Sequence, residues 1–233
     1  MNTATYQHRR GEIEQYFDRT AAKTWARLTS DAPVGRIRAT VRAGRDRMRG
    51  TLLSWLPDDL HGRRILDAGC GTGALATEAA QRGAEVVAID LSPTLVALAR
   101  ERAAARQFAG SVDFRSGDML DPSLGEFDHV VAMDSLIHYR AHDVVAALSR
   151  LAQRTRHSVL FTAAPRTPAT LLMLGMGKLF PRSDRSPAIE PASPAELRRL
   201  MAADVALSAW HTGRCAHVAG GFYKSQALEW VRS

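Results

Sequence analysis

A glycine-rich stretch over residues 65–73 (ILDAGCGTG) holds the residues that are most clearly arranged for chemistry. Gly69, Gly71 and Gly73 would let the chain turn tightly and let a ligand approach the backbone closely. The spacing alone leaves two cofactor classes open, because Gly69, Gly71 and Ala74 also satisfy the looser dinucleotide fingerprint.

The acidic residue directly before the glycines favours one of these classes. The carboxylate of Asp67 would lie close to a pyrophosphate and repel it, yet it suits the cationic methionine end of S-adenosylmethionine. Charge therefore favours the sulfonium cofactor, from which methyl transfer leaves S-adenosylhomocysteine as product.

Two further carboxylates follow at the ends of the next expected strands. Asp90 can accept both ribose hydroxyls through its two oxygens, in either cofactor class. Asp118 could bind the adenine amino group while Met119 packs on the ring, as expected of methyltransferases and not of dinucleotide enzymes. Each aspartate could instead merely cap the next helix or turn. The predicted cofactor site comprises Asp67, Gly69, Cys70, Gly71, Gly73, Asp90, Leu91, Asp118, Met119 and Met133.

From residue 63 onward, short apolar runs alternate with helix-sized segments, a pattern typical of a parallel sheet. We expect strands at 64–68, 85–89, 112–115, 127–133, 158–162, 205–210 and 221–229, and helices at 72–82, from 93, at 142–154 and at 194–202. Ser92 and Pro93 form a helix start signal. The sequence thus predicts an α/β fold of the Rossmann-like class I methyltransferase type, with a mostly parallel seven-stranded sheet and helices on both faces.

Segments outside this alternation are expected to surround the acceptor. Two amphipathic helices precede the first strand and are expected to lie across the upper edge of the sheet as a lid. The predicted units are an N-terminal helical lid (1–60), a cofactor-binding Rossmann-like core (61–164), a substrate-binding insertion after strand five (165–193) and a C-terminal completion of the core sheet (194–233).

Composition and charge restrict the partners. The formal net charge is +7, and six arginines face a single acid, Asp46, between residues 34 and 50. Such a segment suggests nucleic acid, a lipid surface or an acidic substrate, or simply a solvated helix face. Cys70 and Cys215 lack metal-ligand spacing, and no apolar signal segment begins the chain. We therefore expect a cytoplasmic protein with no protein-bound metal and at most peripheral membrane contact.

The fourth strand runs into the string AMDSLIHY at residues 132–139, which places side chains where an acceptor would lie. An Asn-Pro-Pro-Tyr-like motif for planar amines is absent there. No cysteine pair is arranged for attack on a pyrimidine ring either. The acceptor is therefore expected to be neither a planar amine nor a carbon of a pyrimidine ring.

Four stretches together resemble one family, the magnesium-protoporphyrin IX O-methyltransferases of bacteriochlorophyll-making bacteria. They are IEQYFDR at 13–19, AMDSLIHY at 132–139, GKLFPRSDRSP at 177–187 and GFYKS at 221–225. The resemblance spans nearly the whole chain, although residues 216–220 are less basic than the family pattern.

The resemblance implies methyl transfer to a propionate carboxylate of magnesium protoporphyrin IX, giving the monomethyl ester in (bacterio)chlorophyll biosynthesis. It supports His138 and Tyr16 as the groups that orient the carboxylate or the ring; either residue could instead only pack. Substrate contacts are expected from Asp134, Ile137, Tyr139, Lys178, Arg182 and Arg185. It also suggests the large porphyrin-binding subunit of magnesium chelatase as a partner, at the photosynthetic membrane.

Two other kinds of function remain open at this point. One is a methyltransferase for another acceptor, such as a quinol or RNA, although the sequence shows no aromatic platform for stacking bases. The other is a non-enzymatic binder that keeps the cofactor pocket.

Overall fold

A seven-stranded sheet organises the chain in the computed structural model, which describes residues 4–21, 28–29, 35–166 and 188–233. The strand order is β3-β2-β1-β4-β5-β7-β6. The strands are β1 (Arg64–Ala68), β2 (Glu85–Asp90), β3 (Ser111–Ser116), β4 (Phe127–Ala132), β5 (Thr155–Ala163), β6 (Trp210–Gly220) and β7 (Tyr223–Arg232).

The first five strands pair in parallel, and β7 and β6 complete the sheet in antiparallel fashion. Strand order runs outward in one direction from β1 to β3 and in the other from β4 onward. At such a reversal the connections leave in opposite directions, which opens a crevice beyond the carboxyl ends of β1 and β4. The fold class predicted from the sequence is therefore confirmed.

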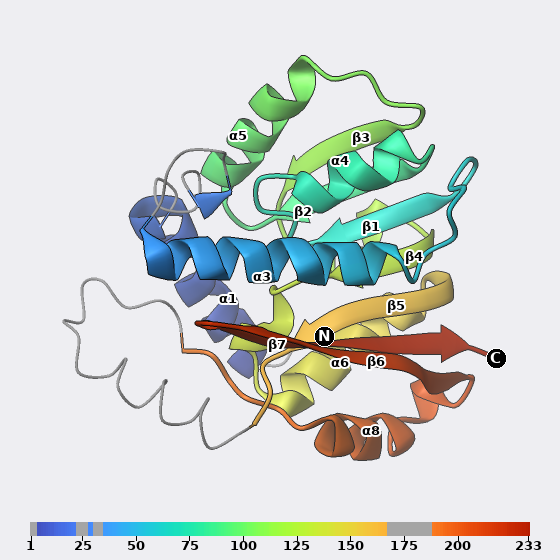
Figure 1. Cartoon of the computed structure of the whole chain (residues 1–233). Coiled ribbons are helices and arrows are strands. Elements are labelled where there is room, and N and C mark those ends of the chain that lie inside the picture. The colour runs from blue at the N-terminus through green and yellow to red at the C-terminus, as the bar shows by residue number, and fades with distance from the viewer. Residues whose placement is uncertain (1–3, 22–27, 30–34, 167–187) are drawn as a thin grey trace.

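Helices cover both faces of the sheet (Figure 1). On one face lie α3 (Arg36–Leu53), α4 (Ala74–Gln81) and α5 (Pro93–Ala104), which share a core with Ile65, Val131 and Leu160. On the other face lie α6 (Ala141–Ala152) and α8 (Pro194–Ala202), which pack around Phe161 and Trp230. Burial of these apolar side chains on both faces explains why the central strands are nearly continuous apolar runs.

Most element boundaries agree with the sequence prediction, and the start of α5 shows why. Ser92 Oγ accepts a hydrogen bond from the backbone N of Leu95 at 3.2 Å, and Pro93 occupies the first turn. The predicted strand at 205–210 is wrong. Val205–Leu207 is instead a 3₁₀ turn, η5, because Asp204 Oδ1 accepts from the Ala206 N at 3.0 Å and holds the chain in a turn.

The first residues form α1 (Ala4–Gln15) and the π-helical turn η1 (Tyr16–Ala21), which we call the lid segment. In Figure 1 it lies on the side toward which β1 and β5 point. Of the two N-terminal helices expected at this edge, α3 reaches it only in part: Arg42, Arg45 and Arg49 line a cavity there, while the other side of the helix packs on the sheet. Met48 and Leu52 of α3 are 0% exposed against the sheet face, because its C-terminal half supplies apolar side chains to the core.

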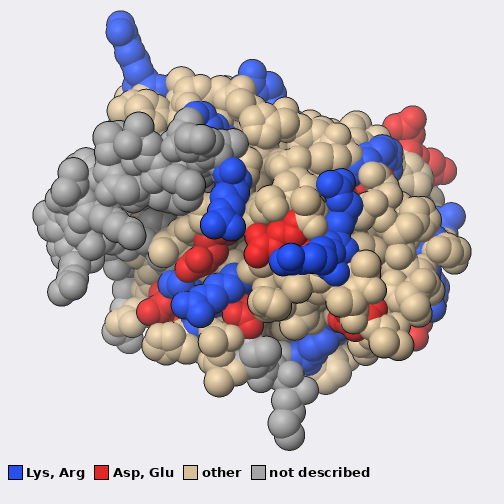
Figure 2. Space-filling view, turned by 90° about the horizontal axis from the view of Figure 1, so that it is seen from below, with Lys and Arg blue, Asp and Glu red and all other residues tan. Residues whose placement is uncertain are grey.

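Charged side chains are interleaved on the surface shown in Figure 2, where arginines and lysines alternate with acidic residues. On this face the net positive charge therefore does not gather into one basic field. Within the part of the chain that the structure describes, no helix combines the length and the apolar character needed to cross a bilayer.

The close approach of α3 to β7 is testable at Gly44. A Cβ added there would lie 2.5 Å from Cδ1 of Tyr223, whereas one added at Gly50 of the same helix would meet no described atom within 4 Å. Gly44→Ala should lower the free energy of unfolding by roughly 1–3 kcal/mol through overpacking. Gly50→Ala, the matched control, should raise it by up to about 1 kcal/mol. Urea denaturation measures both; equal stability of the two variants would contradict the tight contact.

Candidate active site

A cavity of about 560 Å³ opens at the carboxyl ends of β1, β2 and β4. It brings together most of the predicted site. The predicted residues that line it are Asp67, Gly69, Cys70, Gly71, Asp90, Leu91, Met119, Met133, Asp134, His138 and Tyr139.

The glycine loop forms one wall of this cavity. Gly69 has φ 88°, and a Cβ there would lie 2.3 Å from the Cβ of Ser135, so only glycine fits. The backbone N atoms of Gly69 and Cys70 both donate to the carbonyl of Ile89, at 2.8 and 3.0 Å. These bonds fix the loop against the end of β2, while Gly73 caps α4 beside Phe114.

Asp67 is a buried carboxyl group at the edge of the cavity. It is 1% exposed, and its Oδ2 has no hydrogen-bond partner among the described residues. Burial, together with the nearby charge of Asp90, raises the pKa of Asp67 to about 7. A buried carboxylate with an unused oxygen is costly unless a cation or donor meets it. The position therefore suits the ammonium end of a ligand.

Asp90 is held in place by backbone donors. Its Oδ2 accepts from the N of Gly71 at 2.8 Å, and its Oδ1 accepts from the N of Ser92 at 3.0 Å. Burial raises the pKa of Asp90, and these bonds oppose the rise. Each carboxylate oxygen has a second lone pair, so Asp90 can still accept two hydroxyl groups, as the sequence predicted.

Asp118 contacts the lid segment instead of lining the cavity. Its Oδ1 accepts from the hydroxyl of Tyr6 at 3.0 Å and from the N of Leu120 at 2.9 Å. Its Oδ2 pairs with Arg10 at 3.3 Å. An adenine contact at Asp118 would have to share these oxygens, and it stays a prediction. Sequence reasoning missed both lid residues, although their i, i+4 spacing puts them on one face of a helix.

Aromatic rings of the lid segment also pack on Tyr139 and His138, two residues predicted to lie near the acceptor. Tyr6 stacks on Tyr139, with ring centroids 4.8 Å apart, and burial raises the pKa of both hydroxyls. Phe17 lines the cavity and packs edge-on against His138 at 5.8 Å, and Tyr16 packs edge-on against Phe17 at 5.2 Å. The lid therefore lies directly above His138, which is 5% exposed in the turn η3 (Leu136–His138).

Asp18 ties the lid to the cofactor loops at a second point. Its Oδ1 accepts from the hydroxyl of Ser92 and from the N of Thr94, both at 3.1 Å. This carboxylate thus sits at the N-terminus of α5, where the helix dipole favours negative charge. Nothing in the sequence around Asp18, which follows Tyr16 and Phe17, indicated this pairing.

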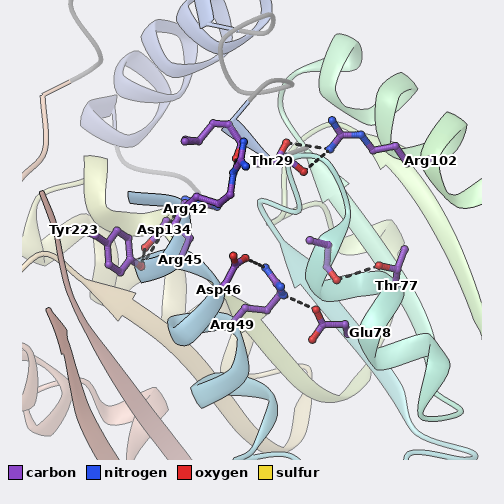
Figure 3. A network of polar contacts seen from close by, with 12 residues as sticks. Thr29, Arg42, Arg45, Asp46, Arg49, Thr77, Glu78, Arg102, Asp134 and Tyr223 are labelled. Atoms are coloured by element: carbon purple, nitrogen blue, oxygen red, sulfur yellow. Dashed lines mark hydrogen bonds and ion pairs between the residues drawn. The ribbon is translucent and has the colours of Figure 1, made fainter. Parts of the chain in front are cut away.

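The remaining predicted acceptor residues lie on β4 and beyond. Asp134 lines the cavity, but its carboxylate bonds to Arg45 and Tyr223 (Figure 3). Ile137 offers its carbonyl to the N of Glu190 at 2.8 Å. The predicted anchors Lys178, Arg182 and Arg185 lie outside the described residues. Among the residues that the structure describes, no group of three or more His, Cys, Asp or Glu side chains could hold a metal ion.

A sheet of this order, with a glycine loop after β1 and acids ending β1 and β2, defines a class I methyltransferase. The family model described as a methyltransferase domain matches residues 65–158. A second model, described as the C-terminus of magnesium-protoporphyrin IX methyltransferase, matches residues 132–232.

Relatives narrow the class to one family. The chain is 49% identical over 97% of its length to magnesium-protoporphyrin O-methyltransferase of Rhodobacter capsulatus, 97% of which is covered. It is 30% identical over 95% of both chains to that of Synechocystis. The crystal structure of the Synechocystis enzyme with bound S-adenosylhomocysteine superposes with a TM-score of 0.83 at 27% identity, covering 96% of this chain and 99% of the other. The chain belongs to the magnesium-protoporphyrin O-methyltransferase family, which confirms the resemblance noted in the sequence.

Proposed function

We propose that this protein transfers the methyl group of S-adenosylmethionine to a propionate carboxylate of magnesium protoporphyrin IX, forming the monomethyl ester in (bacterio)chlorophyll biosynthesis. Family membership supports the substrate and the cofactor. The observation that carries the proposal is that one cavity contains both the buried, half-satisfied carboxylate of Asp67 and the imidazole of His138.

The residues on the cofactor side fit S-adenosylmethionine. Asp67 supplies an unused buried oxygen to the ammonium group, and Asp90 supplies lone pairs to the ribose hydroxyls. The glycine loop allows the ligand to lie against the backbone. S-adenosylmethionine would supply an electrophilic methyl group on its sulfonium sulfur.

On the acceptor side, the oxygen atoms of the porphyrin are those of its two propionate groups, so O-methylation must take place on a propionate. A propionate has a reference pKa of about 4 to 4.5, so it is ionised near neutral pH without a strong base. The protein must instead align one carboxylate oxygen with the methyl group and replace its water. A donor should meet this carboxylate, because burying it without a partner is costly.

His138 and Tyr16 are our candidates for this donor role. His138 lies in the cavity wall, and Tyr16 lies one residue from Phe17, which packs on the His138 ring. Movement of the lid segment would therefore shift Tyr16 and Phe17 relative to His138. We further propose that Lys178, Arg182 and Arg185 anchor the second propionate, and that the exposed Arg36 and Arg38 of α3 meet the large subunit of magnesium chelatase.

Product chemistry tests the reaction. The purified protein, incubated with methyl-labelled S-adenosylmethionine and magnesium protoporphyrin IX, should yield a labelled porphyrin that loses its label in alkali, as an ester does. Metal-free protoporphyrin, a quinol and RNA serve as comparison acceptors. An alkali-stable product, or label appearing only on the quinol or on RNA, would refute the proposal.

The pKa of Asp67 predicts how cofactor affinity changes with pH. Since burial, with the charge of Asp90, raises this pKa to about 7, the ligand-free site is mostly protonated at pH 6 and mostly ionised at pH 8. The ammonium group of the ligand needs the ionised form of Asp67, so the dissociation constant of S-adenosylhomocysteine should rise roughly tenfold from pH 8 to pH 6. Calorimetry measures this change, and Asp67→Asn should weaken binding and remove the slope. A flat profile in the wild type would contradict the assigned role.

The raised pKa of Asp67 also makes the stability of the ligand-free protein depend on pH. The folded pKa of Asp67 lies above its unfolded value of about 4, so ionisation is disfavoured in the folded state. The contribution of Asp67 to stability is therefore greatest below about pH 4 and is lost as the pH rises toward about 7.

The donor roles predict a loss of turnover without a loss of cofactor binding. His138→Ala and Tyr16→Phe should lower kcat by roughly tenfold to a hundredfold, because the carboxylate is no longer held in line. The affinity for S-adenosylhomocysteine should change little. His142→Ala, an exposed histidine on α6, is the control and should retain wild-type kcat. A large loss of S-adenosylhomocysteine affinity in His138→Ala would mean that the residue serves the cofactor instead.

A further inference from the structure

The carboxylate of Asp134 lies at the junction of three elements. Its Oδ2 pairs with Nη1 of Arg45 at 2.6 Å, and both of its oxygens accept from the Tyr223 hydroxyl at 3.1 Å. Its Oδ1 also accepts from Thr162 Oγ1 at 3.2 Å. The Asp134 side chain is only 7% exposed. These contacts join α3, β5 and β7 through one side chain at the end of β4. Figure 3 shows the contacts with Arg45 and Tyr223.

The backbone at Asp134 is also set by these contacts. Its φ of 54° makes it the single non-glycine residue with positive φ in the described part of the chain. Its N donates to Thr162 Oγ1 at 2.7 Å, so one hydroxyl holds both the backbone and the carboxylate of the same residue. Aspartate tolerates this left-handed conformation better than most residues.

The turn at Asp134 determines where the chain goes next. Ser135 is pressed against Gly69 of the glycine loop, where a Cβ would approach its Cβ to 2.3 Å. The turn η3, ending at His138, follows directly. The left-handed residue therefore sets the position of His138 relative to the glycine loop.

The partners of Asp134 are themselves fixed in place. Tyr223 packs so closely on α3 that Gly44 has no room for a Cβ. Arg45 is one residue further along that helix and lines the cavity. Burial, with the charge of Asp134, raises the pKa of the Tyr223 hydroxyl, which keeps it a hydrogen-bond donor.

We propose that Asp134 is a positioning residue for methyl transfer, which, through its bonds to Arg45, Tyr223 and Thr162, holds the turn that carries His138 at a fixed place against the glycine loop. The sequence analysis expected Asp134 to contact the substrate. We assign it this indirect role instead, because its carboxylate is already used by Arg45, Tyr223 and Thr162. This inference rests on the proposed function and adds a residue to the machinery of that site.

Three variants separate the carboxylate from the backbone. Asp134→Asn keeps the shape and the tolerance for positive φ but removes the charge, and Asp134→Gly keeps only the backbone freedom. Tyr223→Phe removes one donor from outside the turn. Glu229→Gln is the matched control: Glu229 is also a buried carboxylate paired with an arginine, Arg214, at 2.6 Å, but it lies outside the cavity lining.

All three variants should lower kcat at least roughly tenfold through misalignment. The KM for magnesium protoporphyrin and the S-adenosylhomocysteine dissociation constant should stay within about twofold of wild type, since substrate and cofactor contacts are retained. Glu229→Gln should keep wild-type kcat even where its Tm falls. Wild-type kcat in Asp134→Asn and Tyr223→Phe would overturn the proposal, as would a kcat loss that merely follows Tm across all four variants.

A spectroscopic measurement tests the position of His138 without turnover. The ring carbon–proton resonances of His138, assigned by their loss in His138→Gln, should shift in Asp134→Asn and in Tyr223→Phe, while those of the distant, exposed His211 stay in place. Unmoved His138 resonances in both variants would overturn the proposal. Should the wild type fail to methylate magnesium protoporphyrin, the proposed function would fall, and these resonances would still decide whether Asp134 positions His138. If Asp134→Asn did not fold, Tyr223→Phe would decide alone.

Discussion

Burial of negative charge at the carboxyl ends of adjacent strands is the constraint on which the rest of the site depends. Asp67 is buried at the end of β1 and Asp90 is partly buried at the end of β2, and the charge of Asp90 adds to the burial that raises the pKa of Asp67. Asp90 is partly compensated by the backbone N atoms of the glycine loop and of Ser92. Asp67 is not compensated to the same degree, since one of its oxygens has no described partner. A cationic ligand therefore completes an electrostatic arrangement that the protein leaves incomplete.

The lid segment is attached to the loops that carry this arrangement. Asp18 bonds to the residues that follow Asp90, and Tyr6 bonds to Asp118 after β3. Phe17 packs on His138 from the same segment. Any ligand that shifts the loops at the ends of β2 and β3 must therefore shift the lid, so cofactor binding and the shape of the acceptor site are mechanically linked.

Sequence reasoning worked where a local rule decides the structure. Ser92 and Pro93 start a helix through contacts within one turn, and glycines at 69 and 71 are required by positive φ. It failed where partners come from distant segments. Nothing near Asp134 indicates that Arg45 and Tyr223, each 89 positions away along the chain, would use its carboxylate. The apolar residues at 205–210 likewise suggested a strand, because the apolar pattern does not reveal that the side chain of Asp204 caps a turn there.

The arginine-rich helix shows the same limit from the side of charge. Six arginines against one acid suggested an anionic partner, but several of these guanidinium groups pair within the fold. Arg49 bonds to Asp46 and to Glu78 at 2.8 and 2.6 Å, and Arg45 bonds to Asp134 (Figure 3). These pairs join α3 to α4 and to the end of β4. They neutralise arginine charge that the composition alone suggested was available to a partner. The exposed Arg36 and Arg38 at the start of α3 remain available to a partner. Arg45 and Arg49 instead fix α3 beside the cavity, and the position of α3 affects methyl transfer through the contact of Arg45 with Asp134.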